Sequence, residues 1–397
     1  MQGRSIFSPS SGGKRFAPTQ TYWIHLRGAL VCIILPPMKI ALAASWLNQY
    51  GGAERVLEAA HALYPTAPIF TSLFRPGFLP AFYQTWDVRA SFLDHFPTNS
   101  ARLLLPLFPA AFESFDLRGY ACVVSITSAF AHGVRVANGA QHICYCLTPA
   151  RFLWNYADYV EREQIGKLPR ALLPLVIARL RAWDRRAVEH VTTFIAISET
   201  VRARIAQHYQ RDAIIIHPPV EVERFTVSRE RDDYFLIVSR LVPYKRIDLA
   251  VQAFGELGLP LVIAGDGRDR ARLEALAKSN VRFLGRVSDD VARDLMARCR
   301  AFIFPGEEDF GITPLEANAC GKPVIAFAGG GALETTLAGV TGELFREPTA
   351  QSLAEVVRAF DARQYDPNVI RAHAEKFGVN VFKEKLHSLI VGSLDRF

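Results

Sequence analysis

Two glutamates in the second half of the chain bracket a loop with the sequence EEDFGITPLE. Glu308 and Glu316 follow an apolar run, Ala301 to Phe304, that is typical of a buried parallel strand. Thr313 and Pro314 suit the N-cap and first turn of a helix, which places Glu316 at its N3 position. Because a helix N-terminus presents free N–H groups to an anion, this loop is a candidate phosphate site.

Each glutamate also has a purely structural interpretation. Thr313-x-x-Glu316 fits a capping box, in which Glu316 bonds only the backbone at the helix start. Glu308 lies between Glu307 and Asp309, and three like charges on one loop cost stability unless solvent or a ligand offsets them. A solvated acidic loop is the alternative to a ligand site, and the residues alone leave both open.

Two basic residues, Arg240 and Lys245, follow the predicted strand Tyr234 to Ser239. Fixed cations at a strand end would stabilise the charge that builds on a departing diphosphate. The alternative is a surface pair, which is unusual beside a helix start because cations are disfavoured there. In the first half, Gly51 and Gly52 separate a strand from a helix, where glycine lets the backbone approach a ligand closely.

The elements that position these residues predict an α/β protein. Strands alternate with helices in both halves of the chain, which indicates two doubly wound, mostly parallel sheets. We expect Rossmann-like domains at residues 38–219 and 220–375, with the boundary after Pro218-Pro219, and a C-terminal helix within 376–397. Residues 1–37 are expected to form a disordered extension, and a signal peptide is the alternative.

Composition narrows the class of partner. The chain has 397 residues, of which 50% are hydrophobic and 21% charged, and its formal net charge is +7. This is globular composition with a moderately basic surface, which favours nucleotide diphosphates, lipid phosphates or an anionic membrane leaflet. No nucleic-acid recognition motif accompanies the charge. The six cysteines read as buried, reduced thiols of a cytosolic protein, and Cys144-x-Cys146 lacks the further ligands of a metal site.

Two segments allow a membrane interpretation. Ala90 to Leu117 is aromatic and apolar, and it predicts either core helices or an exposed patch that docks on a membrane or a lipid-linked acceptor. Leu168 to His190 predicts a long basic helix, whose charged face is either solvated or rests on anionic lipid.

The motifs together resemble the retaining GT-B glycosyltransferases, family 4 in the sequence classification. Glu308-x7-Glu316, with Phe310-Gly311 inside and Pro314-Leu315-Glu316 closing it, carries the resemblance, which runs from about Met38 to the C-terminus. The sequence of the segment from Glu308 to Thr335 is most similar to that of bacterial GDP-mannose-dependent mannosyltransferases of polysaccharide assembly. The resemblance implies two Rossmann-like domains facing across a cleft, with the last helix crossing back onto the first domain.

The resemblance also implies an activity. We expect transfer of a hexose, mannose from GDP-mannose, to a polysaccharide or lipid-linked glycan at the cytoplasmic face of the membrane. The implied catalytic residues are Glu308, Arg240, Lys245 and His132, and Arg151 is assigned to the acceptor side. A metal is not demanded, because two cations can replace it, and no cofactor is implied. The implied donor-binding residues are Gly51, Gly52, Arg240, Lys245, Val287, Asp289, Phe310, Gly311, Ile312, Thr313 and Glu316.

One motif departs from the family pattern. The family usually has Cys-His-Thr-Pro-x-Arg, with the histidine contacting the transferred sugar, whereas this chain has Leu147 at that position. Leucine has no hydrogen-bonding group, so the histidine role is vacant. Either His132 or His142 substitutes, the acceptor sugar differs, or activity is impaired. A sugar-nucleotide epimerase on the same fold and a non-catalytic nucleotide-sugar-binding protein therefore remain as alternatives.

Overall fold

The computed structural model describes residues 20–26, 29–35, 39–97, 104–155 and 167–394. Its first compact unit, Met1–Lys39, contains the strands β1 (Gln20–Leu26) and β2 (Ala29–Leu35), which pair antiparallel. This differs from the expected disordered extension at residues 1–37 wherever those residues are described. The apolar, partly β-branched sequence ALVCIIL of β2 favours a strand.

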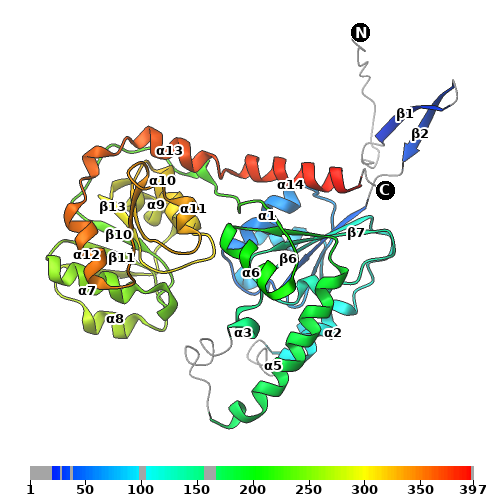
Figure 1. The fold of residues 1–397 in the computed structure, drawn as a ribbon, viewed down its shortest axis with the longest axis horizontal. Helices are drawn as coiled ribbons and strands as arrows, with labels where there is room; N and C mark the ends of the chain where they lie inside the picture. The colour runs from blue at the N-terminus through cyan, green and yellow to red at the C-terminus, as the bar shows by residue number, and fades with distance from the viewer. Residues whose placement is uncertain (1–19, 27–28, 36–38, 98–103, 156–166, 395–397) are drawn as a thin grey trace. The chain divides into compact units, whose positions relative to one another are not determined.

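The second unit, Ile40–Phe397, contains two wholly parallel sheets (Figure 1). The first has the strand order β5-β4-β3-β6-β7-β8-β9. Its strands are β3 (Ile40–Ala44), β4 (Ile69–Thr71), β5 (Val88–Ala90), β6 (Cys122–Thr127), β7 (Gln141–Cys146), β8 (Thr193–Ala196) and β9 (Ile214–Ile215). Every neighbouring pair is parallel, so the carboxyl ends of all seven strands lie at one edge.

Helices cover both faces of this sheet. Along β6, Val124 packs in the cluster that contains α1 (Gly52–Leu63) and α14 (Val379–Leu394), whereas Val123 packs in the cluster with α2 (Phe108–Glu113), α3 (Arg151–Trp154) and α5 (Lys167–Ala187). This alternation follows from the two-residue period of a strand buried on both faces. The α-helices are α1 (Gly52–Leu63), α2 (Phe108–Glu113), α3 (Arg151–Trp154), α5 (Lys167–Ala187) and α6 (Glu199–Tyr209). The 3-10 helices are η1 (Pro76–Phe78), η2 (Ala81–Thr85), η3 (Phe92–His95), η5 (Leu105–Leu107), η6 (Ala131–Gly133), η7 (Val188–His190) and η8 (Val222–Arg224).

The second sheet has the order β12-β11-β10-β13-β14-β15, and Pro218-Pro219 precedes it in the chain. Its strands are β10 (Phe235–Val238), β11 (Leu261–Ala264), β12 (Val281–Gly285), β13 (Ala301–Phe304), β14 (Val324–Phe327) and β15 (Gly342–Phe345). Its helices are η9 (Pro243–Lys245), α7 (Ile247–Leu257), α8 (Arg270–Leu276), α9 (Asp289–Arg298), α10 (Ile312–Ala319), α11 (Ala332–Thr335), α12 (Ala350–Ala359), η10 (Ala362–Gln364), α13 (Pro367–Glu375) and α14 (Val379–Leu394). Two doubly wound parallel sheets were predicted, and this is confirmed.

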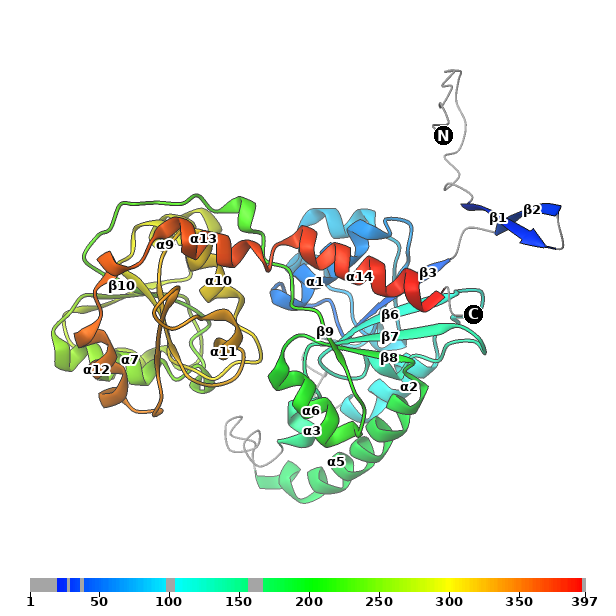
Figure 2. The ribbon, with the colours of Figure 1, turned by 45° about the horizontal axis from the view of Figure 1, so that its top comes forward.

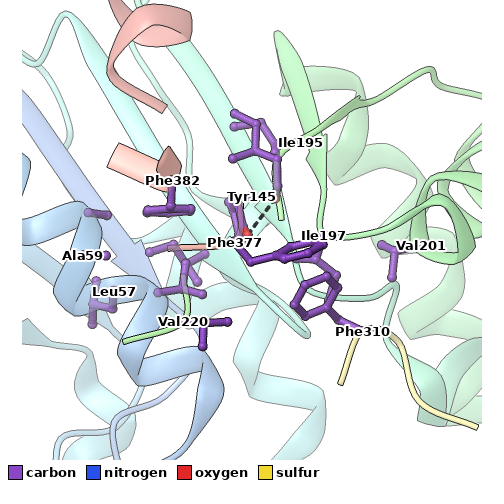
Figure 3. Packing of buried hydrophobic residues seen from close by; sticks show 14 of the residues in the cluster. Leu57, Ala59, Tyr145, Ile195, Ile197, Val201, Val220, Phe310, Phe377 and Phe382 are labelled. Carbon is purple, nitrogen blue, oxygen red and sulfur yellow. Dashed lines mark hydrogen bonds between the residues drawn. The ribbon is translucent and has the colours of Figure 1, made fainter. Parts of the chain in front are cut away.

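The last helix, α14, packs on the first sheet and not on the second (Figure 2). Phe382 of α14 meets the Tyr145 ring of β7 edge-on, with ring centroids 5.6 Å apart, and the Tyr145 hydroxyl donates to the Ile216 carbonyl oxygen at 2.9 Å (Figure 3). Val220, before the second sheet, forms a parallel bridge with Gly378, before α14. The two segments that connect the sheets therefore run side by side.

The two segments with a membrane interpretation behave differently. Of Ala90 to Leu117, the side chains of Leu93, Phe108 and Phe112 are buried, as a core segment requires, while Phe92 and Phe96 are exposed. Residues 98–103 lie outside the described residues. The predicted long helix exists as α5 followed by η7, with one face buried and an opposite face of exposed arginines. Among the described residues no helix combines the length and apolar character that crossing a membrane needs.

Candidate functional site

The acidic loop after β13 lies against the triple glycine after β14. Glu308 forms a parallel bridge with Gly330, and the Gly331 N–H donates to the Glu308 carbonyl oxygen at 2.8 Å. A Cβ added at Gly330 would lie 2.1 Å from that same oxygen, and Gly330 has φ of 60°. Only glycine fits this position, so the triple glycine is what lets the two loops meet.

Each carboxylate of the acidic loop contacts a basic side chain. Lys245 forms an ion pair with Glu308. Asp309 accepts from Arg151 at 2.5 Å and also pairs with Arg204, which lies 3.8 Å from Glu307. From the sequence, solvent or a ligand was expected to offset the repulsion among these three carboxylates. The structure shows a third source, namely cations of the chain itself.

The helix start after this loop differs from the predicted one. α10 begins at Ile312, with Gly311 at the N-cap and φ of 97°, and no side chain caps it. Thr313 is therefore not the N-cap, and the capping box with Glu316 does not form. The left-handed conformation of Gly311 starts the helix two residues earlier than the polar pattern suggested. The free N–H groups of the first turn include those of Ile312 and Thr313.

Glu316 instead bonds a residue of the first sheet's helices. Nη1 of Arg55, in α1, donates to Oε1 of Glu316 at 2.5 Å. Burial disfavours the charged form of Arg55, but the Glu316 carboxylate outweighs this and raises the pKa of Arg55. Nearby, a Cβ added at Gly52 would lie 3.0 Å from Cδ1 of Ile312. The first turns of α1 and α10 are therefore close together, as the predicted roles of Gly51, Gly52 and Ile312 at one diphosphate require.

A small pocket lies at the carboxyl edge of the first sheet. Ser45 follows β3, Ser128 follows β6 and Leu147 follows β7, while Glu54 enters from α1. Glu54 is only 3% exposed, and its burial raises its pKa to about 7, although the backbone N–H groups of Glu54 and Gly51 and the charge of Arg240 oppose the shift. Arg240 is thus near enough to this pocket to act on its carboxyl group.

Neither histidine proposed as a substitute for the family histidine reaches a ligand site. His132 is 3% exposed, and its Nε2 lies 2.9 Å from Oδ1 of the buried Asp184 of α5. His142 is fully buried, with Nε2 2.9 Å from the Ser125 hydroxyl, and burial lowers its pKa to about 3. The expected sugar contact of His132 stays a prediction, and in the structure α5 covers that loop and supplies the partner Asp184.

Other predicted residues have defined structural partners. Ser288 caps α9, and Asp289, in its first turn, accepts from Arg224 at 3.1 Å. Val287 is partly buried beside this cap. Phe310 is buried and stacks on His217 with ring centroids 5.3 Å apart. Contacts of Val287 and Asp289 with a base stay predictions.

Sequence reasoning overlooked Glu54, Arg55 and Arg204. The first two follow Gly51-Gly52 after one alanine, in the sequence GGAER, so their place beside a glycine turn was a usable signal. Arg204 shares its helix with a second arginine, Arg202, and nothing in its local sequence distinguishes it. Within the described residues, no cluster of histidine, cysteine or carboxylate side chains has the grouping of a metal site.

Comparison with known proteins agrees with this geometry. Residues 221–377 match the family described as glycosyl transferases group 1. The alpha-1,3/1,6-mannosyltransferase ALG2 of Dictyostelium discoideum is 32% identical over 295 residues, covering 62% of this chain and 66% of that protein. A GDP-mannose-dependent monoacylated alpha-(1-6)-phosphatidylinositol monomannoside mannosyltransferase of Corynebacterium glutamicum is 30% identical over 205 residues, covering 44% and 54%. Other relatives are named glycogen synthase and D-rhamnosyltransferase.

Among solved structures, HepE of Anabaena in complex with UDP-glucose is similar with a TM-score of 0.67 and 20% identity, covering 89% of this chain and 100% of that one. At this identity the likeness shows the fold, which is GT-B. The chain spans about half to two thirds of the length of the two mannosyltransferases above. The chain thus carries a glycosyl transferases group 1 domain, and its predicted resemblance to GT-B glycosyltransferases is confirmed.

The buried carboxyl of Glu54 predicts a pH dependence. Its folded pKa of about 7 lies above its ordinary value of 4.5, so between these values the folded chain holds a proton that the unfolded chain has released. The stability contributed by this carboxyl is complete below pH about 4.5 and is lost as pH rises through about 7. Glu54→Gln cannot ionise, so its thermal midpoint relative to wild type should rise across this window.

Calorimetric unfolding of both proteins at a series of pH values from about 4.5 to about 8 measures this difference. Glu384→Gln, at an exposed position of α14, is the control and should show no such trend. A difference between Glu54→Gln and wild type that is independent of pH contradicts the raised pKa.

Proposed function

We propose that this protein is a retaining glycosyltransferase that moves a hexose from a sugar nucleotide to a glycan or lipid-linked acceptor. The observation that carries the proposal is the meeting of Lys245 and Glu308 beside the first turn of α10. This arrangement offers a cation, free backbone N–H groups and a hydrogen-bonding carboxylate within one site. Those are the groups that a diphosphate and its attached sugar need.

In the proposed reaction, the acceptor oxygen forms a bond to the anomeric carbon as the bond from that carbon to the phosphate oxygen breaks. The acceptor hydroxyl proton passes to the departing phosphate oxygen, so attack occurs on the face that the diphosphate leaves. Lys245, Arg240 and the α10 N–H groups stabilise the charge on that leaving group. Glu308 accepts from sugar hydroxyls, and Glu316 from the ribose, which requires each to share or release its present ion pair.

We propose mannose as the transferred sugar and guanine as the base. Two observations support this donor. The sequence from Glu308 to Thr335 resembles that of GDP-mannose-dependent enzymes, and two relatives are named mannosyltransferases. The UDP-glucose complex of HepE makes a UDP-sugar the competing donor. The donor is therefore the first property to be measured.

The catalytic roles predict large losses of activity. Glu308→Gln and Lys245→Ala should each reduce glycosyl transfer by about 10² or more, because each removes a preorganised charge that acts on the reacting groups. Transfer from labelled GDP-mannose to lipid-linked acceptors measures this. Lys278→Ala, which removes a lysine from a different loop of the same sheet, is the matched control. Wild-type turnover in either site variant rejects the assigned role.

The same assay separates the alternatives. A labelled glycan or lipid supports transfer, an altered donor without acceptor indicates an epimerase, and binding without product indicates a nucleotide-sugar-binding protein. A nucleotide-sugar-binding protein remains an alternative because Leu147 lines the pocket where the family pattern has a histidine.

The donor proposal predicts an order of nucleotide affinities. GDP should raise the thermal midpoint of unfolding more than UDP at equal concentration, because a ligand that binds only the folded state stabilises it in proportion to its affinity. Differential scanning fluorimetry over a concentration series measures both nucleotides. Equal protection, or stronger protection by UDP, removes guanine from the proposal.

We also propose that the face formed by η1 and η3 contacts an anionic membrane. Arg75 pairs with Asp94 and donates to the Phe96 carbonyl oxygen at 2.9 Å, which holds η1 and η3 together. Phe78 is 63% exposed, and Phe92 and Phe96 are 42% exposed. Exposed aromatic rings on a basic protein suit an interface between lipid and water.

Co-sedimentation with phosphatidylglycerol vesicles tests this contact. Replacing Phe78, Phe92 and Phe96 by serine should lower the bound fraction several-fold, because each ring contributes apolar area to the interface. The control replaces Leu276, Val291 and Val369, which are exposed apolar residues of the other half, by serine. Equal loss in both variants, or no binding by wild type, contradicts the proposal.

A further inference from the structure

Asp309 is the most extensively paired carboxylate of the acidic loop. Its side chain is 14% exposed and contacts two guanidinium groups, those of Arg151 and Arg204. Both arginines come from helices that follow strands of the first sheet, α3 after β7 and α6 after β8, whereas Asp309 follows β13 of the second sheet. The pairs therefore join loops of the two sheets across a sequence separation of more than one hundred residues.

Arg204 is held more completely than a surface arginine. Its side chain is 24% exposed, and beyond Asp309 its Nη2 lies 3.8 Å from Glu307. Nη1 also lies 3.5 Å from the Thr148 hydroxyl, which belongs to the Thr-Pro-Ala-Arg segment. An isolated exposed ion pair contributes little, but a network of low exposure fixes geometry as well as charge.

The helix that carries Arg204 has a second contact with the same loops. The Glu199 N–H, at the start of α6, donates to Oε1 of Glu334 at 2.9 Å, and Glu334 belongs to α11 after the triple glycine. Glu334 thus supplies an acceptor for one of the free N–H groups at the α6 N-terminus. α6 is therefore anchored at its N-terminal end by α11, which follows β14, while Arg204 of α6 reaches the acidic loop after β13.

The neighbours of Asp309 are the residues with proposed functions. Glu308 precedes it and pairs with Lys245, and Phe310 follows it and is stacked on His217. Glu308, Asp309 and Phe310 are consecutive residues of one short backbone segment. The arginines fix Asp309 and the His217 ring fixes Phe310, and together these contacts restrict the orientation of Glu308. Without the arginines, three neighbouring carboxylates would share one lysine and repel one another.

We propose that Arg204, together with Arg151, is a positioning residue that holds Glu308 for the donor sugar by fixing Asp309. Arg151 thus acts on the acidic loop, whose Glu308 is proposed to bind the donor sugar, whereas the sequence analysis assigned Arg151 to the acceptor side. The inference rests on the proposed function for the role of Glu308, but the contact itself does not depend on that function. It also implies that the Thr148 to Arg151 segment and α6 support the donor site from the opposite sheet.

The test uses Arg204→Gln, which removes the charge and keeps much of the side-chain length. Turnover of GDP-mannose should fall by about tenfold or more in kcat, while the affinity for GDP, which lacks the sugar, should stay within about twofold of wild type. A general structural defect would lower both quantities. Arg204→Lys, which retains the charge without the planar fork, should recover part of the loss.

A double-mutant cycle tests whether the effect runs through Asp309. Asp309→Asn should reduce turnover to a similar extent, and adding Arg204→Gln to it should change turnover by less than about twofold. Arg202→Gln is the matched control, since Arg202 lies on the same helix and forms its ion pair with Glu199, outside the acidic loop. Losses that multiply in the double variant, or an Arg204→Gln enzyme with wild-type kcat, overturn the proposal.

Hydrogen–deuterium exchange separates this proposal from the proposed function. Amides of residues 307–311 should exchange about tenfold faster in Arg204→Gln than in wild type, while those of β13 are unchanged. If wild type turns over no sugar nucleotide but the loop still exchanges faster in the variant, the positioning contact stands and the proposed function fails. Unchanged exchange at residues 307–311 overturns the positioning role itself.

Discussion

Compensation of the three carboxylates at residues 307–309 is the constraint on which the site depends. Like charges on adjacent residues repel, and a short loop cannot separate them. The chain resolves this by bringing Lys245 from the neighbouring strand end and Arg151 and Arg204 from the other sheet. The ion pairs of Arg151 and Arg204 therefore do two things at once: they neutralise the acidic loop, and they join it to loops of the first sheet.

That arrangement needs a close backbone approach, which the glycines provide. Gly330 lies against the Glu308 carbonyl oxygen, where any Cβ would overlap it, and Gly311 starts α10 with a left-handed conformation. The carbonyl of Glu308 is thus tied to the loop after β14, while its carboxylate is directed to Lys245. The backbone fixes the loop, and the ion pairs then select the side-chain orientation.

Local sequence patterns predicted the elements well and the long-range partners poorly. β13 was predicted residue for residue, because a short buried apolar run that ends at a Pro-Gly break has one interpretation. The α10 start was misplaced, since the polar pattern at Thr313 concealed the conformation of Gly311. The partner of Glu316, 261 residues away in α1, has no local signal at all, because only the packing of the two sheets creates the pair.

The histidines show how burial decides between alternatives that sequence leaves open. His132 and His142 could each have replaced the family histidine on residue type, yet Asp184 and Ser125 already bond them inside the first sheet's core. Neither histidine lines the pocket beside Leu147. The pocket wall at Leu147 lacks that donor, whereas Ser45, Gln49, Glu54 and Ser128, together with the Trp46 indole, supply polar groups elsewhere in its lining. A sugar hydroxyl beside Leu147 would find no hydrogen-bonding partner in that side chain, so an apolar edge of a ligand suits this position.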